Sequence, residues 1–289
     1  MFVSAPLTVR RSVAVSARPL IALLILVSIP NWSRADNLQD QLNSEYKGKN
    51  QLLRNFYSGD NLAYDQNGDL RVVDNPGSWT LAEVQIKSIS VTTLGVDILG
   101  DRLGVLYTAG NPGLIKVGEL KIHIDANTRP ELNQILPKIF IDPKEDLRPL
   151  VSDYWKYFMA GTDQKSRKAA WENDIRKRPV QVFKPKDFPA GELKPPRAVS
   201  APDPKYTPEA ASRHIEGTAV LSLVVDTKGA ANDVAIIQSV GLGLDEQAVI
   251  AVKKWHFAPA TRNGEAVPVE LKIEITFRCC PLEYAGQAP

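Results

Sequence analysis

Near its carboxyl end, this sequence alternates strictly between apolar and polar side chains over twelve residues, Val267 to Arg278. The odd positions hold only Val, Leu, Ile and Phe, and the even positions hold Pro, Glu, Lys, Thr and Arg. Because side chains along a strand point to opposite faces in turn, this pattern predicts a long strand with one buried face. Little sequence follows it, so we expect one edge of this strand to be open to another protein.

The residues before this strand predict a small sheet packed against one helix. Residues 217–226 and 233–239 have the composition of two strands, joined by a short turn into a hairpin. From Leu244 to Trp255, apolar residues recur at helical spacing, and Pro259 prevents the helix from continuing. Asn263-Gly264 then predicts a tight turn into the alternating strand. The expected order is ββαβ, with the helix covering one face of the sheet.

Several short motifs occur in a fixed order between residues 206 and 277. They are Tyr206 and Pro208, Glu216-Gly217, Asp226 and Gly229, Ser239 and Gly241, Leu244-Asp245, Trp255-x-Phe257-x-Pro259-Ala260 and Asn263-Gly264. This segment of about 72 residues in a chain of 289 resembles the TonB C-terminal domain.

The resemblance implies a ββαβ domain in the periplasm of a double-membraned bacterium. Domains of this family bind an extended segment of an outer-membrane transporter at the edge of their sheet, which is a form of strand addition. Anchored members use the proton-motive force through an inner-membrane motor complex. Carried over by position, the partner-binding residues would be Asp203, Pro204, Lys205, Tyr206, Val269, Leu271, Lys272, Ile273 and Ile275.

Residues 1–35 have the parts of a secretory signal. Three arginines precede the uncharged run Pro19–Ser33, and Ser33-Arg34-Ala35 is a small-x-small cleavage pattern. We expect cleavage after Ala35 and a periplasmic protein. The alternative is an uncleaved inner-membrane anchor, although a spanning helix needs about twenty apolar residues. Anchored energy transducers of the TonB family carry a histidine in that helix, whereas the first histidine here is His123.

The predicted fold class is α+β in two domains. Residues 36–160 contain many short strand-like runs separated by Gly, Asn, Asp and Pro, which predicts an all-β domain, a small barrel or sandwich. Residues 130–140 and 145–159 have helical periodicity and form its expected helical tail. The TonB-like domain occupies residues 205–280.

Between them, residues 161–204 are basic and rich in proline. From Lys165 to Lys205 there are eleven Lys and Arg against five Asp and Glu, and residues 179–204 contain seven prolines. Proline has no amide hydrogen to donate, so we expect a solvated linker that forms neither a sheet ladder nor a helix interior.

Composition argues against several other kinds of protein. A formal net charge of +2 gives no support to nucleic-acid binding, and the two cysteines, Cys279 and Cys280, form no disulfide framework. The run Asp65–Asp69 begins like a calcium loop but lacks its later ligands, so a turn is the better interpretation. No phosphate loop, nucleophile motif or metal-ligand spacing occurs, and we expect no catalytic residue, metal or cofactor.

Three alternatives to a transporter-binding periplasmic adaptor stay open at this point. The first is an anchored energy transducer, and the second is a structural protein in which the last strands of two copies pair as a homodimer. The third is a periplasmic ligand carrier, which requires the first domain to be a barrel with an apolar cavity. The partner in the leading hypothesis is an outer-membrane transporter or another envelope protein.

Overall fold

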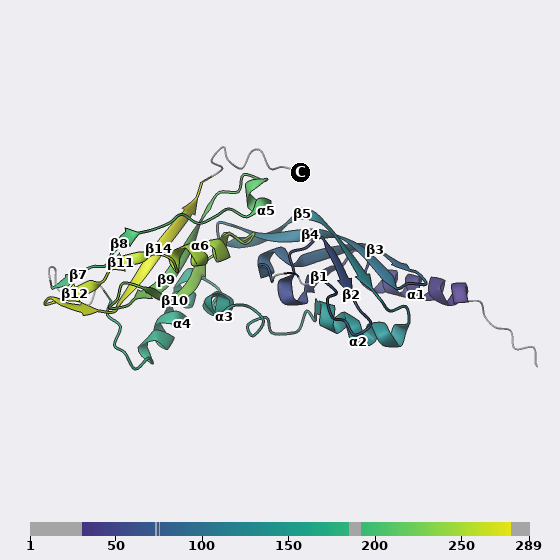
Figure 1. Cartoon of the computed structure of the whole chain (residues 1–289), viewed down its shortest axis with the longest axis horizontal. Coiled ribbons are helices and arrows are strands. Elements are labelled where there is room, and N and C mark those ends of the chain that lie inside the picture. The colour runs from purple at the N-terminus through teal and green to yellow at the C-terminus, as the bar shows by residue number, and fades with distance from the viewer. Residues whose placement is uncertain (1–30, 73, 75, 185–191, 279–289) are drawn as a thin grey trace, which may run out of the picture.

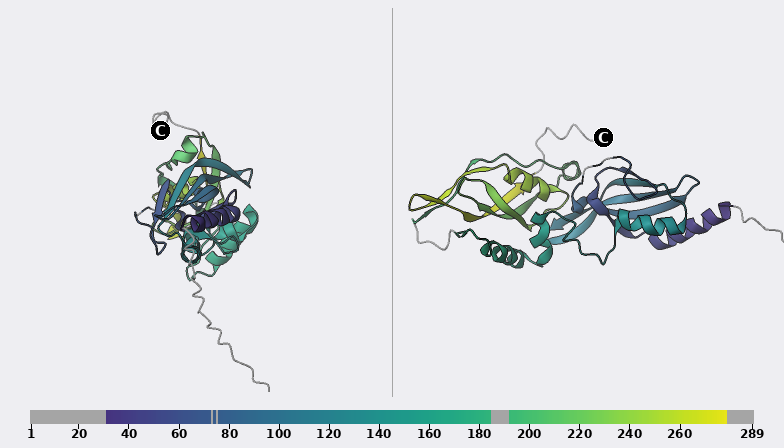
Figure 2. Two further views of the ribbon diagram at one scale, coloured as in Figure 1. Left: turned by 90° about the vertical axis from the view of Figure 1, so that its right-hand side faces the viewer. Right: turned by 60° about the horizontal axis from the view of Figure 1, so that its bottom comes forward.

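The computed structural model describes residues 31–72, 74, 76–184 and 192–278. For residues 31–36 it describes the backbone alone. The molecule is elongated, and two lobes follow one another along its long axis (Figure 1 and Figure 2). One lobe contains a six-stranded sheet, and the other contains a three-stranded sheet with small additional strands. The predicted α+β class is confirmed. The predicted secretory signal and the two cysteines lie outside the described residues, and the expected cleavage point after Ala35 falls within helix α1.

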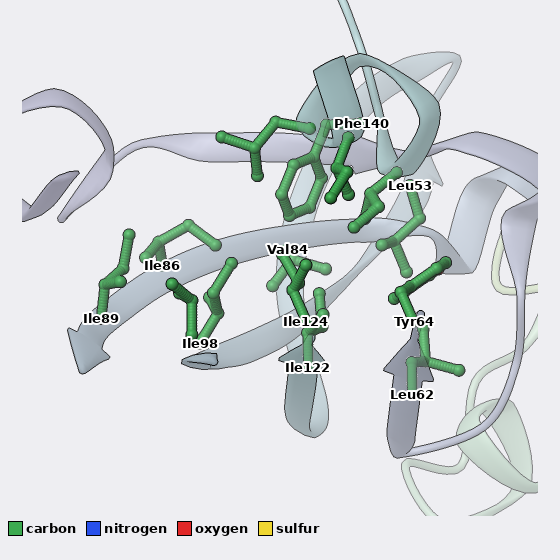
Figure 3. Close-up of a cluster of buried hydrophobic side chains, with 14 of the residues drawn as sticks. Leu53, Leu62, Tyr64, Val84, Ile86, Ile89, Ile98, Ile122, Ile124 and Phe140 are labelled. Carbon is green, nitrogen blue, oxygen red and sulfur yellow. The ribbon is translucent and has the colours of Figure 1, made fainter. Parts of the chain in front are cut away.

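The amino-terminal lobe is a single curled sheet in the order β2-β5-β4-β3-β1-β6. Its strands are β1 (Asn50–Leu53), β2 (Asn61–Tyr64), β3 (Glu83–Val91), β4 (Val96–Thr108), β5 (Asn111–Ile124) and β6 (Phe140–Ile141). Helices α1 (Asn31–Tyr46) and α2 (Arg129–Ile139) contribute buried leucines and isoleucines to the same core as the sheet. Figure 3 shows the apolar side chains of β1 to β6 gathered on one side of this sheet.

Neither a closed barrel nor a two-sheet sandwich forms in the described part of this lobe, where the sheet is half-open. Residues 99–101 (Leu-Gly-Asp), one of the separators between the strand-like runs, form no turn, because β4 runs through them and pairs with β3, with a register shift between Ile86 and Ser88. A Cβ on Gly100 would lie 2.5 Å from Val84 Cγ1, so glycine here permits close approach of β3 and does not end the strand.

The second predicted helix of this lobe is only partly formed. Residues 145–152 are non-helical, and the helical part consists of the 3-10 turn η3 (Asp153–Trp155) and the short helix α3 (Lys156–Ala160). Trp155 and Phe158 are buried in the core of the carboxyl-terminal lobe, not in the amino-terminal core. The segment therefore packs with residues much later in the sequence, which its periodicity could not show.

The carboxyl-terminal lobe has a three-stranded antiparallel sheet in the order β10-β9-β14. Its strands are β9 (Gly217–Val225), β10 (Ala231–Gln238) and β14 (Val269–Phe277), as the hairpin and the alternating run predicted. Helices α5 (Pro208–Ala211) and α6 (Leu244–Val252) precede and follow the hairpin. The apolar side chains of α6 pack against one face of the sheet, including the odd positions of β14.

The opposite face of this sheet is covered as well, which corrects the prediction of one covered face. Helix α4 (Gln164–Arg176) lies within the range expected to be a solvated linker. Its Trp171 and Ile175 pack against the second face of the sheet, on β9 and β10. Val220 and Val224 of β9 are buried there. The apolar residues of β9 on both faces explain why this cover is needed, since an uncovered second face would expose valines to water.

Short strands surround this sheet at its far end. Helix α6 ends at Val252, three residues earlier than expected, because residues 256–258 form β11 (His256–Ala258). Strand β8 (Arg197–Ser200) pairs with β11, and β7 (Leu193–Lys194) pairs with β12 (Ala260–Arg262). The expectation that residues 179–204 form no ladder is therefore wrong: the residues between the prolines retain their amides and pair at sheet edges. Strand β13 (Glu265–Val267) follows β12 through the predicted Asn263-Gly264 turn, whose residues have φ of 52° and 88°.

The two lobes are joined by main-chain pairing. The hairpin of β4 and β5 reaches the loop before α6, where the amide of Tyr107 donates to Val240 O at 2.9 Å. The amide of Leu242 donates to Val105 O at 3.0 Å on the same pair of segments. Gly241 lies between them with φ of 94°, and a Cβ there would lie 2.1 Å from Val105 O. This junction holds one end of the carboxyl-terminal sheet against the first lobe.

Candidate partner-binding edge

Strand β14 is the last strand of the small sheet and pairs along its whole length with β9 on one side only. On its other side, the described residues supply one partner, Phe183, at the beginning of the strand. The amide of Phe183 donates to Pro268 O at 3.0 Å, and the amide of Glu270 donates to Phe183 O at 2.8 Å. Beyond Glu270, no main-chain pairing to this outer side is made by any residue that the structure describes.

The contact with Phe183 identifies which residues of β14 direct their main-chain groups outward. Because the amide of Glu270 points away from β9, strand geometry gives the same direction to Lys272, Glu274 and Thr276. The amides of Leu271, Ile273 and Ile275 accordingly point toward β9. The predicted binding residues thus divide into two classes: Lys272 offers an outward amide, whereas Leu271, Ile273 and Ile275 support the strand from inside the sheet.

The side chains along β14 also alternate, with one exception. Ile273, Ile275 and Phe277 are buried in the core under α6, and Val269 is buried at the start of the strand, as the pattern predicted. Glu270 is buried too, although the pattern placed it on an exposed face. Its carboxylate lies 3.2 Å from Lys168 Nζ on α4 and 3.7 Å from Lys184 Nζ beside the Phe183 contact. Two cations from the basic segment thus neutralise the one acid of the strand that α4 covers.

The other predicted binding segment lies at the far end of the same strand. Asp203 and Lys205 are exposed, and Pro204 and Tyr206 are partly buried. The Tyr206 ring packs edge to face on Phe277, with centroids 5.5 Å apart. The structure therefore brings residues 203–206 to the end of β14, although they do not cover its outward amides.

The opposite margin of the sheet, β10, is already engaged by α4. The indole of Trp171 donates to Asp233 O at 2.9 Å, and the Arg167 guanidinium donates to Ile237 O at 3.3 Å. Side chains of α4 thus occupy two main-chain acceptors of β10, whereas the described residues leave the outer side of β14 unpaired beyond Glu270. An exposed strand margin of this kind is a template for another strand.

The start of α6 contains two acids, Asp245, which is fully buried, and Glu246, which is partly buried. Asp245 accepts hydrogen bonds from the amides of Val240 and Gly241 and from Ser239 Oγ at 2.6–2.9 Å. Burial and the neighbouring Glu246 raise the pKa of Asp245 to about 7, against the opposing effect of these donors. Asp245 thereby fixes the loop that meets the first lobe. Its spacing of six residues after Ser239 is the sequence signal that could have identified it.

The remaining expectations concern metals, membranes and cavities. Asp65 accepts from the amides of Asn67 and Asp69 at 2.7 and 3.0 Å, which confirms a turn in place of a calcium loop. Across residues 31–278, apart from the undescribed gaps, no group of His, Cys, Asp and Glu has a metal-binding arrangement. None of the helices in the described part has the length and apolar character needed to cross a membrane.

The curled sheet of the first lobe encloses very little space. The cavity among Leu42, Ile86, Ile98, Leu132 and neighbouring core residues has a volume of about 10 Å³. This is roughly the volume that one water needs, far below the size of a ligand pocket. The interior is filled by side chains of the sheet and the two helices, so it offers no support to the ligand-carrier alternative.

The geometry defines an α+β domain in which a helix packs on a three-stranded antiparallel sheet and the last strand has an open margin. Residues 202–279 match the family model described as "Gram-negative bacterial TonB protein C-terminal". This segment of the chain is therefore a TonB C-terminal domain, as the motifs predicted. The match leaves the amino-terminal lobe without a family assignment.

Similar proteins share this part of the chain. A Pseudomonas aeruginosa relative, "Protein tonB2", is 37% identical over 79 residues, which are 25% of this chain and 29% of the relative. A Vibrio cholerae relative, "Protein TonB", is 32% identical over 117 residues, or 40% of this chain and 43% of the relative. The chain thus spans less than half the length of these curated relatives.

A solution NMR structure of the Pseudomonas aeruginosa TonB C-terminal domain is matched over its full length, which corresponds to 35% of this chain. The identity is 20% and the TM-score is 0.26.

Proposed function

We propose that this protein acts in TonB-dependent energy transduction by binding an extended segment of an outer-membrane transporter to the outer margin of β14. The observation that carries the proposal is the row of outward main-chain groups at Lys272, Glu274 and Thr276, which has no partner among the described residues. Strand addition takes affinity from such groups and specificity from alternate side chains. The family match supports this role, since TonB proteins are non-enzymatic energy transducers whose C-terminal domains are periplasmic.

The contact of Phe183 with Pro268 and Glu270 defines where an incoming strand would begin. A partner that leaves this contact intact pairs from Leu271 onward and has room for about six or seven residues before Phe277. Tyr206 and the exposed residues Asp203 and Lys205 then lie where the far end of the bound segment would emerge. This arrangement supports a contact surface made of β14 and residues 203–206.

Photo-crosslinking tests the proposed margin directly. A photoreactive amino acid at Glu274 would lie on β14, and the matched control at Asn232 would lie on β10, the opposite margin. Both native side chains are exposed. With outer-membrane transporters present, we expect an adduct of chain plus transporter from Glu274 and none from Asn232. Adducts from Asn232 alone, or equal yields from both positions, would contradict docking at β14. An adduct of two copies of this chain would favour the homodimer.

Proline substitutions separate binding from folding. Glu274→Pro removes an outward amide with no partner inside the described chain, so we expect transporter affinity to fall at least tenfold while the domain stays folded. Ile273→Pro removes an amide that points to β9 and should unfold the domain. Glu274→Ala keeps the amide and controls for the Lys272–Glu274 ion pair, whose charged atoms lie 2.7 Å apart. Unchanged affinity in folded Glu274→Pro would argue against the proposal.

The location and anchoring of the chain depend on residues 1–35, most of which lie outside the described residues. A cleaved signal predicts a mature periplasmic chain that starts at Asp36, whereas an anchored energy transducer keeps its amino-terminal segment and contacts an inner-membrane motor complex. The mass of the protein purified from its host distinguishes these two forms. A start at Asp36 would exclude the anchored form.

A further inference from the structure

A three-residue segment of this chain, Val182–Lys184, occupies the first positions on the outer margin of β14. Phe183 forms a parallel bridge with Val269, through the two hydrogen bonds that it makes with Pro268 and Glu270. The three long strands of the sheet, in contrast, are antiparallel to their neighbours. The segment is therefore a short strand added to the margin of the sheet, in the place where a foreign strand would pair.

Two side chains anchor this segment to neighbouring elements. Val182 packs against the buried cluster that contains Trp171 and Ile175 of α4. The Arg262 guanidinium of β12 lies over the Phe183 ring, with its central carbon 5.8 Å from the ring centroid. At this distance the ring face attracts the cation. Displacing the segment would expose an apolar side chain and break this contact.

Four charged side chains tie the segment to β14 and to α4. Lys184 Nζ lies 2.5 Å from Glu172 Oε2 and 3.7 Å from Glu270 Oε2. Lys168 Nζ lies 3.2 Å from Glu270 Oε1 and 3.7 Å from Glu172 Oε1. The side chains of Glu270 and Lys184 are only 9% and 19% exposed, so salt screens their pairing weakly. Because a buried charge that loses its partner is costly, the network resists withdrawal of Lys184.

The anchored segment ends where the open part of the margin begins. Among the residues that the structure describes, none pairs with the outer side of β14 after Glu270. The open part runs over residues 271–277, a length of roughly 23 Å at about 3.3 Å per residue. A foreign strand can extend further toward the start of β14 only by taking the place of Phe183.

We infer that Val182–Lys184 is a built-in stop, which fixes the register of a strand docked on β14 and the point where that strand must leave the sheet. The inference rests on the proposed docking of a transporter segment and adds to it the end point of the docked strand. The partner that fits is an extended segment with a residue unable to continue the ladder, such as proline, where its chain meets Phe183. A longer uninterrupted strand would have to break the ion pairs of Lys184 before it could reach Pro268 and Glu270.

Hydrogen exchange and fluorine NMR test the stop on the whole chain. The probe is an isotope-labelled peptide of about fifteen residues from the periplasm-facing extended segment of an outer-membrane transporter, and 4-fluorophenylalanine replaces Phe183. When the peptide binds, we expect the amides of Lys272, Glu274 and Thr276 to exchange at least tenfold more slowly. The fluorine resonance should stay unchanged, because the ring remains against Arg262.

The two readouts separate the stop from the docking on which it rests. A fluorine resonance that moves to its unfolded-chain position, together with protection of the three amides, would show that the peptide displaces Phe183. That result would overturn the stop and leave docking at β14 intact. Unchanged exchange at the three amides would contradict docking itself, and the stop with it.

A pair of proline variants tests whether the segment sets the register. Phe183→Pro removes the amide that donates to Pro268 O, and Val180→Pro is the matched control, because Val180 is 60% exposed and lies outside the bridge. In Phe183→Pro we expect at least tenfold faster exchange of the Glu270 amide in the free chain. The protected stretch of the bound peptide should lengthen by two or three residues. Val180→Pro should change neither quantity.

A protected stretch of equal length in the wild-type chain and in folded Phe183→Pro would overturn the stop. Should Phe183→Pro fail to fold, the fluorine resonance of the otherwise unaltered chain still decides.

Discussion

At the scale of single residues, the junction between the lobes depends on a position, Gly241, where only glycine fits. Gly241 combines positive φ with a main-chain oxygen where its Cβ would be, because β4 passes directly over it. Gly264, in the turn between β12 and β13, has a similar φ of 88° and open space around it. An alanine at Gly264 would therefore meet only an unfavourable backbone conformation, whereas an alanine at Gly241 would also clash with a main-chain oxygen.

Replacing each of these glycines with alanine measures that difference. Gly264→Ala should lower the free energy of unfolding by about 1–2 kcal/mol, the cost of positive φ for an alanine. Gly241→Ala should cost at least about 2 kcal/mol more, because β4 and the loop before α6 must separate. Urea denaturation of the two variants gives both values. Equal losses would contradict the close main-chain contact at the junction.

The buried acids at the start of α6 predict a pH dependence of stability. Burial raises the pKa of Glu246 above its ordinary value of 4.5, and the pKa of Asp245 rises from 3.8 to about 7. The folded state therefore keeps protons that the unfolded chain has already lost, so this stabilisation is present below about pH 4 and declines as pH rises toward 7. Glu246→Gln should make the decline shallower. Unfolding free energies measured at several pH values provide the check, and a profile unchanged in the variant would contradict it.

Single residues also show how far sequence reasoning extends. The buried odd positions of β14 follow directly from the two-residue period of a strand, and they were predicted correctly. Glu270 was predicted to lie on the polar face of β14, and no residue near Asp245 or Glu246 in the sequence predicted their burial. Their burial depends on partners distant in sequence, namely Lys168, the loop at 239–241 and Ser78. A local sequence pattern cannot predict contacts between residues so far apart in the chain.

At the scale of secondary-structure elements, α4 is the main addition to the expected ββαβ domain. It covers the second face of the sheet, and its side chains donate to main-chain oxygens of β10. The ribbon places α4 beside β10 (Figure 1). It was missed because its surface is highly polar, and its basic residues and the later prolines favoured a linker. Only Trp171 and Ile175, four residues apart, carry the buried side of this helix.

Removing the large side chain of α4 tests this cover. Trp171 is fully buried, and its indole donates to β10. Trp171→Ala should therefore lower the free energy of unfolding by about 3–5 kcal/mol. Lys165→Ala, at an exposed position of the same helix, should change it by less than about 0.5 kcal/mol. A small loss for Trp171→Ala would mean that α4 does not cover the sheet in solution.

At the scale of the whole molecule, the lobes share more than a connecting chain. Main-chain pairing at Tyr107 and Leu242 crosses the junction, and so do the edge-to-face contacts among the rings of Trp79, Trp155 and Phe158. Sequence reasoning predicted two domains and a solvated linker, because it had no means of pairing the β4–β5 hairpin with a loop over a hundred residues later.

This junction predicts that the two lobes unfold together. We expect a single calorimetric transition for the whole chain, with equal calorimetric and van't Hoff enthalpies. Gly241→Ala should disturb the junction and broaden or divide that transition. Two well-separated transitions in the wild-type chain would indicate lobes that are independent of each other.

The central claim is that β14 presents main-chain groups that a foreign strand can occupy. Amide hydrogen exchange at Lys272, Glu274 and Thr276 measures this most directly, in the free chain and with the periplasm-facing segment of an outer-membrane transporter bound. The account predicts fast exchange at these three amides in the free chain and strong protection in the complex, with Leu271 and Ile273 protected in both. Protection of the three amides before the segment is added, or continued fast exchange in a formed complex, would contradict it.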